Sequence, residues 1–163
     1  MNEELISAFQ ERNALRLSYK SQALEDDEIF TLMNRQYEPY FIFIADLVNY
    51  VEVLHRNEKN YCMDGAMTNF LEKGSMQNIY FFAALNPDKT SSAAGDSVYE
   101  SFVYYRTGVH LGGYADSLSH MEFPGMGYRE LAVGDKPGCG LVSAGDNTQA
   151  IRIVTPFARG EAK

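Results

Sequence analysis

Two short apolar runs, each followed by a polar residue, constrain the fold of this chain more than any other feature. Residues 40–45 read Tyr-Phe-Ile-Phe-Ile-Ala before Asp46, and residues 78–84 read Asn-Ile-Tyr-Phe-Phe-Ala-Ala shortly before Asn86. Continuous apolar runs of this length are typical of strands that are covered on both faces, as in a parallel sheet. A helix is predicted over about residues 47–56 and a looser one over 62–72, so that the order is strand, helix, strand.

The rest of the chain fits an α/β fold. We expect a helix over residues 3–20 and a second that starts at the acidic cluster 25–28 and runs to about Asn34. A further helix is predicted from Asp96 to about Tyr105, followed by a third strand of the parallel sheet at 109–111. The Gly/Pro-rich segment over 114–140 is expected to wrap an edge of the sheet. Residues 141–144 and 151–154 are predicted to form an antiparallel pair around the turn 145–147. The prediction is a parallel sheet flanked by helices that ends in a hairpin at its edge.

Composition excludes several classes of protein. The chain has 163 residues, enough for one domain, with 45% hydrophobic and 22% charged residues. Its net charge is −8, spread along the whole sequence without a cluster of Lys and Arg, so we expect no nucleic-acid partner. No apolar run is long enough to span a membrane, and no signal peptide is visible. Two reduced thiols are favoured over a disulfide between Cys62 and Cys139.

Asp46 and Asn86 are the candidates for a ligand site, because ligands of parallel sheets bind beyond the carboxyl ends of the strands. A carboxylate in the place of Asp46 holds magnesium in nucleotide hydrolases. The alternatives are structural: Asp46 as the N-cap of the next helix, and Asn86 before Pro87 as a turn residue. Neither of the two glycine-rich phosphate-binding patterns is present.

Other polar residues give weaker signals. His55, His110 and His120 lack the spacing of metal ligands, and Ser143 lacks the first glycine of a nucleophile elbow. His120 and Glu122 are expected to form a surface pair, and the glycines at 112–113, 138 and 140 to lie in turns. The aromatic residues of the 96–105 helix serve core packing or a peptide-binding groove: Tyr99, Phe102, Tyr104 and Tyr105.

The order of these segments resembles the last ATPase-like domain of the EssC/EccC proteins, the FtsK/SpoIIIE-type motors of type VII secretion. Residues 40–46 are similar to the Walker B strand, 78–86 to the next strand with its polar sensor residue, and 107–113 to a strand that ends in two glycines. Residues 136–140 are similar to a Pro-Gly turn, and 151–156 to the closing strand. The resemblance covers about residues 4–158 and implies a RecA-like parallel sheet.

The departures from that family are informative. Residues 1–163 correspond to a single, partial domain that lacks the portion with the Walker A loop. The Walker B acid pair falls on Ala45 and Asp46, so an alanine replaces the carboxylate that holds magnesium. The resemblance therefore implies that this chain does not hydrolyse ATP and has no catalytic residue, metal or cofactor of its own, although its parent protein uses ATP and magnesium.

What the resemblance implies instead is a role in recruitment. The partners would be secreted substrate proteins, recognised by a helical or carboxyl-terminal signal, and the neighbouring ATPase domains of the same motor. The place of action would be the cytoplasmic side of the membrane, within a larger membrane-anchored protein. Candidates for the substrate surface or for the contact with the preceding domain are Tyr104, Tyr105, Leu111, Met121 and Phe123.

Two other functions remain open at the level of sequence. In the first, Asp46 and Asn86 belong to half of an active ATP-driven translocase domain whose Walker A loop lies upstream. In the second, the chain is an unrelated doubly wound domain that binds a small molecule. A sheet that lacks the 109–111 strand beside the other two would favour this last reading.

Overall fold

A computed structural model describes residues 3–56, 63–112, 115, 118, 120–132, 139–144 and 147–152. The chain divides into two compact units, Met1–Phe102 and Val103–Lys163. In these residues no helix has both the length and the apolar character needed to cross a membrane.

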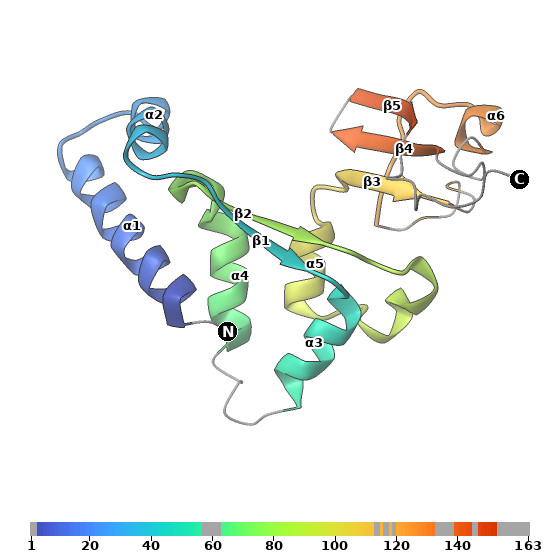
Figure 1. Cartoon of the computed structure of the whole chain (residues 1–163), viewed down its shortest axis with the longest axis horizontal. Helices are drawn as coiled ribbons and strands as arrows, with labels where there is room; N and C mark the ends of the chain where they lie inside the picture. The colour runs from blue at the N-terminus through green and yellow to red at the C-terminus, as the bar shows by residue number, and fades with distance from the viewer. Residues whose placement is uncertain are drawn as a thin grey trace, which may run out of the picture. The chain divides into compact units, whose positions relative to one another are not determined.

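The first unit is made of helices around a two-stranded parallel sheet (Figure 1). Its elements in order are α1 (Glu3–Ser21), α2 (Asp26–Gln36), β1 (Tyr40–Ile44), α3 (Leu47–His55), α4 (Met63–Lys73), η2 (Ser75–Gln77), β2 (Ile79–Ala83), η3 (Pro87–Ser92) and α5 (Ser97–Val103). This order confirms the predicted helices and the two strands. Residues 87–92, which follow the predicted turn at Asn86, form a 3-10 helix, and α5 ends at Val103 rather than near Tyr105.

β1 and β2 pair in parallel, with Tyr40 opposite Ile79 and Ile44 opposite Ala83 (Figure 1). Side chains on one face of this sheet meet the helices, and the core of the unit is apolar. Its buried members include Leu5, Phe9, Ile29, Met33, Leu47, Val48, Val51, Leu54, Met67, Phe70, Ile79, Val98 and Tyr99.

The prediction that the strands are covered on both faces is wrong for the second face. Phe41, Phe43 and Phe82 are 52%, 75% and 48% exposed. The rings pack on one another instead, with centroids 5.1 Å apart for Phe43 and Phe82 and 5.9 Å for Phe41 and Phe82. An apolar run shows that a strand avoids water but not whether its own chain covers it, and here one face lies open.

Arg12 joins α1 to the starts of both strands. Its guanidinium Nη1 donates to the carbonyls of Gln77 (3.0 Å) and Asn78 (2.9 Å), which precede β2, and Nη2 donates to the carbonyl of Glu38 (3.2 Å), which precedes β1. The guanidinium also lies 4.7 Å from the centre of the Tyr37 ring. Burial lowers the pKa of Arg12, and the neighbouring Tyr37 and Glu11 oppose this shift.

The second unit contains an antiparallel sheet. Its strands are β3 (Gly108–Leu111), β4 (Cys139–Ala144) and β5 (Asn147–Arg152), in the order β3-β4-β5, and α6 (Tyr128–Leu131) precedes β4. The predicted antiparallel hairpin is confirmed, but its predicted pairing is wrong. Residues 141–144 pair with 147–150 and not with 151–154, and β5 begins at Asn147, which was predicted to lie in the turn. Part of the Gly/Pro-rich segment, Cys62, residues 136–138 and residues 153–156 lie outside the described part of the chain.

Two topological predictions need correction. β3 pairs antiparallel with β4, with His110 opposite Leu141, and in the described residues it does not join β1 and β2. The hairpin β4–β5 therefore belongs to this second sheet and not to the edge of the parallel one. Gly140 is not a turn residue either: a Cβ there would lie 2.7 Å from the carbonyl oxygen of His110, so the close approach of β3 and β4 requires glycine.

Candidate functional site

Asp46 and Asn86 lie where the sequence placed them, at the carboxyl ends of β1 and β2. Asp46 is the N-cap of α3, and its Oδ1 accepts a hydrogen bond from the backbone N–H of Asn49 at 3.1 Å. Asn86 precedes η3, and its Oδ1 accepts from the N–H of Asp88 at 3.0 Å. Both side chains thus stabilise the start of a helical segment, which is the structural alternative for each.

Backbone bonds also join the two strand ends. The N–H of Ala84 donates to the carbonyl of Ile44 at 2.8 Å, and the N–H of Leu47 donates to the carbonyl of Ala84 at 2.9 Å. Ala45, between these bonded residues, offers only a methyl group. The carboxyl edge of the pair therefore presents one carboxylate and one amide oxygen, each already holding a backbone N–H.

A groove of about 680 Å³ runs along β1 on the side of the helices. The whole strand from Tyr40 to Asp46 contributes to it, together with side chains of neighbouring helices and of β2: Leu5, Asn49, Tyr50, Val53, Met67 and Phe81. Its volume falls in the range of ligand pockets, about 300–1,000 Å³. Sequence reasoning missed this groove, since it depends on how four separate segments meet.

The polar groups of the groove are few. Asp46 is the one charged residue among those that line it, and no Lys, Arg or His takes part. The Tyr50 hydroxyl lies 3.5 Å from the Met67 sulfur, and burial raises the pKa of Tyr50. A wall of aliphatic and aromatic carbon without a basic group suits an apolar partner and does not suit a triphosphate.

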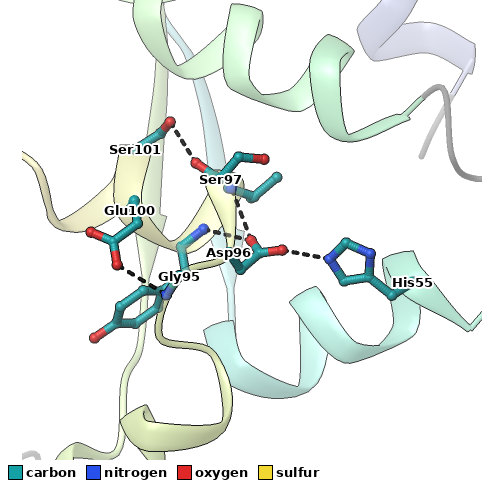
Figure 2. A network of polar contacts seen from close by, with 8 residues as sticks. His55, Gly95, Asp96, Ser97, Glu100 and Ser101 are labelled. Carbon is teal, nitrogen blue, oxygen red and sulfur yellow. Dashed lines mark hydrogen bonds and ion pairs between the residues drawn. The ribbon is translucent and has the colours of Figure 1, made fainter.

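A histidine and an aspartate that are far apart in sequence meet at the opposite end of α3. His55 Nε2 and Asp96 Oδ2 are 2.5 Å apart (Figure 2). Asp96 Oδ1 accepts from the N–H groups of Val98 (2.8 Å) and Tyr99 (2.9 Å). Asp96 thus caps the helix that was predicted to begin at this residue, whereas no local pattern in the sequence indicated its contact with His55. Asp96 holds the start of α5 against the end of α3.

The five candidates for a substrate surface lie in the second unit and differ in their exposure. Tyr104 and Tyr105 are 75% and 72% exposed, with ring centroids 5.0 Å apart, and Leu111 is also exposed. Met121 is buried, and its methyl group lies 3.4 Å from the position of a Cβ on Gly108, so it is a core residue. Phe123 is half-buried against the His110 ring, 6.3 Å between centroids.

The segment before α6 carries two further corrections. Glu122 pairs with Arg106, not with His120. Burial lowers the pKa of His120, and the charge of the nearby His110 adds to this shift. The Ser143 hydroxyl lies 2.5 Å from the Glu122 carbonyl and 3.2 Å from that of Arg106, which ties β4 to this segment. In the described residues no group of three or more His, Cys, Asp or Glu is placed to hold a metal.

Comparison with known proteins gives a fold and not a family. No family model matches the chain, and no curated protein matches it in sequence. In structure the chain is similar to part of the cytoplasmic domain of EssC, with a TM-score of 0.55 and 16% sequence identity. The similarity covers 93% of this chain and 28% of the EssC chain, so the chain spans less than a third of that structure. The fold is thus a mixed α/β arrangement like that of an EssC cytoplasmic segment.

Proposed function

We propose that this chain is an EssC-like, non-catalytic domain of a type VII secretion motor, which binds proteins and does not hydrolyse ATP. One observation carries the proposal: at the Walker B position Ala45 replaces the first acid, and Asp46, the second, holds the N–H of Asn49 as a helix cap. Asn86, at the sensor position, is likewise engaged with Asp88. The fold similarity to EssC supports the choice of motor.

Exposed apolar side chains support protein binding. Tyr104, Tyr105 and Leu111 are 60–75% exposed, and the rings of Tyr104 and Tyr105 lie 5.0 Å apart. Large exposed apolar groups that lie close together mark interaction surfaces, so the tyrosine pair carries this argument. The partners in this proposal are secreted substrate proteins with a helical or carboxyl-terminal signal, and the adjoining ATPase domains of the same membrane-anchored protein on its cytoplasmic side. Met121 leaves the set, because it is buried.

An experiment on secretion tests the proposal. The double substitution Tyr104→Ala with Tyr105→Ala, placed in the full-length motor, should reduce export of type VII substrates by at least about tenfold, the loss expected when a hot-spot pair is truncated. Tyr128→Ala is the matched control, since Tyr128 is 74% exposed. Equal export by the double variant and the parent would contradict recruitment through these tyrosines.

The runner-up function, half of an active ATP-driven translocase domain, has one observation in its favour. Asp46 and Asn86 follow two strands that pair in parallel with Ile44 opposite Ala83, so both lie at one edge of the sheet. A thermal-shift assay with ATP and magnesium distinguishes the two functions. The non-catalytic proposal expects no change in melting temperature, whereas a rise of several degrees that Asp46→Ala removes would favour the translocase.

The third hypothesis, an unrelated doubly wound domain that binds a small molecule, has less support than the other two. It does predict that β3 lies outside the parallel sheet, as observed in the described residues. The similarity to EssC extends over 93% of the chain and thus includes both units. A separate antiparallel sheet after the parallel strands is therefore compatible with an EssC-like fold, and it does not require an unrelated doubly wound domain.

A further inference from the structure

The free edge of β1 carries backbone groups that no described residue pairs. β1 pairs with β2 on one side, and in the described residues with no other strand. The N–H of Tyr40 donates to Asn78 and the carbonyl of Ile44 accepts from Ala84, so Tyr40 and Ile44 face β2. Since alternate residues of a parallel strand face opposite edges, the N–H and C=O groups of Phe41 and Phe43 point away from β2.

The surfaces on both sides of this edge are apolar. On the helix side lies the groove of about 680 Å³, with Leu5, Val53 and Met67 among its walls. On the other side lie the exposed rings of Phe41 and Phe43. A strand added to this edge would place alternate side chains in the groove and beside the rings, so both sets of its side chains would leave water.

The charges around the edge indicate what kind of strand fits. Glu38 precedes β1 and is exposed, Asp46 follows it, and Glu3 begins α1 two residues before Leu5. The base at the start of β1, Arg12, is buried, and its guanidinium donates to backbone carbonyls. The residues that line the groove include no base, and the chain as a whole carries a net charge of −8. A second copy of this acidic chain is electrostatically unsuited to the edge, whereas a basic partner is attracted to it.

From these observations we infer that β1 binds an extended apolar segment of about five residues with basic flanks from another protein, by adding it as a strand to the free edge. The inference does not depend on the proposed function, because it rests on backbone geometry and local charge. It adds a second kind of contact, an extended strand at Phe41 and Phe43, to the helical or carboxyl-terminal signal considered above.

A synthetic peptide tests the inference directly. The probe has five central residues that alternate valine and threonine, with two lysines at each end. Amide hydrogen exchange measured by NMR should show slower exchange at Phe41 and Phe43 when the peptide is added, by at least about tenfold. Ile42 and Ile44, whose N–H groups face β2, should change little. Unchanged exchange at Phe41 and Phe43 would overturn the inference.

Two variants of the protein distinguish backbone pairing from nonspecific hydrophobic binding. Phe43→Pro removes an N–H that faces away from β2, so the β1–β2 ladder stays intact, and proline is tolerated at such an edge position. It should weaken peptide binding by about tenfold or more, whereas Phe43→Ala, which keeps the N–H, should weaken it by about threefold. Equal losses in the two variants would mean that the ring and not the edge binds.

Two further controls address the partner's chemistry. A peptide N-methylated at its five central residues keeps its side chains and charges but cannot donate, so it should not bind. A peptide flanked by glutamates should bind at least about tenfold more weakly than the lysine form, and equal binding would refute the charge requirement. A stable dimer whose Phe41 and Phe43 amides are already protected without peptide would show that a second copy occupies the edge, which also refutes the inference.

Discussion

Replacing Arg12 tests whether one buried guanidinium holds the first unit together at the start of its sheet. Arg12 on α1 donates to the carbonyls of Gln77, Asn78 and Glu38, and these residues lie just before the two strands. Methionine at this position keeps most of the packing volume of the side chain and removes all of its donors. The substitution Arg12→Met therefore isolates the polar contribution.

The magnitude follows from the burial of the accepting groups. Gln77 and Asn78 are 0% and 5% exposed, so water cannot replace the lost donors at their carbonyls. A hydrogen bond from a charged group is worth about 1.5–3 kcal/mol, which gives a loss of about 3 kcal/mol for these two bonds. Glu38 is exposed and its carbonyl regains water, so the third bond adds little. We expect Arg12→Met to lower the free energy of unfolding by about 3 kcal/mol.

Urea unfolding followed by far-ultraviolet circular dichroism measures this loss. For a chain of this size about 3 kcal/mol corresponds to a decrease in Tm of about 6–12 °C. Arg16→Met is the matched control, because Arg16 is on the same helix and its described partner is only the sulfur of Met76, at 3.4 Å. The control should change the free energy of unfolding by less than about 0.5 kcal/mol.

A lysine at the same position sharpens the test. Its single ammonium group cannot reproduce the planar fork that reaches carbonyls on both strand starts, so Arg12→Lys should be less stable than the parent and more stable than Arg12→Met. If Arg12→Met and Arg16→Met unfold at the same urea concentration as the parent, the account of how α1 is joined to the sheet is incorrect.

Three other predictions concern single side chains. Asp96→Ala should lower the free energy of unfolding by about 1–2 kcal/mol, because it removes both the α5 cap and the contact with His55. Asp88→Ala, at an exposed position, should cost less than about 0.5 kcal/mol, and equal losses in urea unfolding would contradict the structural role of Asp96. Because burial lowers the pKa of His120, protonation of this residue favours the unfolded state. The free energy of unfolding should therefore be highest above the usual histidine pKa of about 6.5 and fall as the pH drops below it. In acid titrations His120→Gln should make this fall less steep, and an unchanged slope would refute the assigned role of His120. Met121→Ala should lower the free energy of unfolding, measured with urea, by about 2–5 kcal/mol, because Met121 is buried. Met126 is only half-buried, so Met126→Ala should lower it clearly less. The reverse order would contradict the core position of Met121.

Local patterns were sufficient to predict the α-helices and strands of the first unit, but not its two 3-10 helices. The run from Tyr40 to Ile44 and the run from Ile79 to Ala83 identify strands because β-branched and aromatic residues fill them, and Asp46 and Asp96 mark helix starts because their carboxylates accept free N–H groups. Such signals lie within a few residues of the feature that they predict.

Contacts between distant segments could not be predicted in this way. The β3 run looks like a third parallel strand, and only its pairing with β4 shows that it belongs to another sheet. The His55–Asp96 pair joins residues 41 positions apart, and Arg12 reaches carbonyls 65 and 66 positions away. No spacing in the sequence records such pairs, because they depend on how whole elements pack.

The candidate site could likewise be predicted only in part. Asp46 and Asn86 could be placed at the carboxyl ends of the strands, and the choice between a ligand site and a helix cap required their hydrogen-bond partners. Tyr104 and Met121 were equal as surface candidates in the sequence, since both are large and apolar. Burial separates them, because Met121 packs beneath Gly108 and Tyr104 lies after the end of α5.

The most direct test of a protein-binding domain without nucleotide chemistry is an NMR titration with ATP and magnesium that follows the amides of Asn49 and Asp88. These N–H groups are bound by Asp46 and Asn86, so any ligand that recruits either side chain must disturb them. The account predicts that both amide signals keep their positions at millimolar nucleotide. Saturable shifts of both signals, abolished by Asp46→Asn, would contradict it.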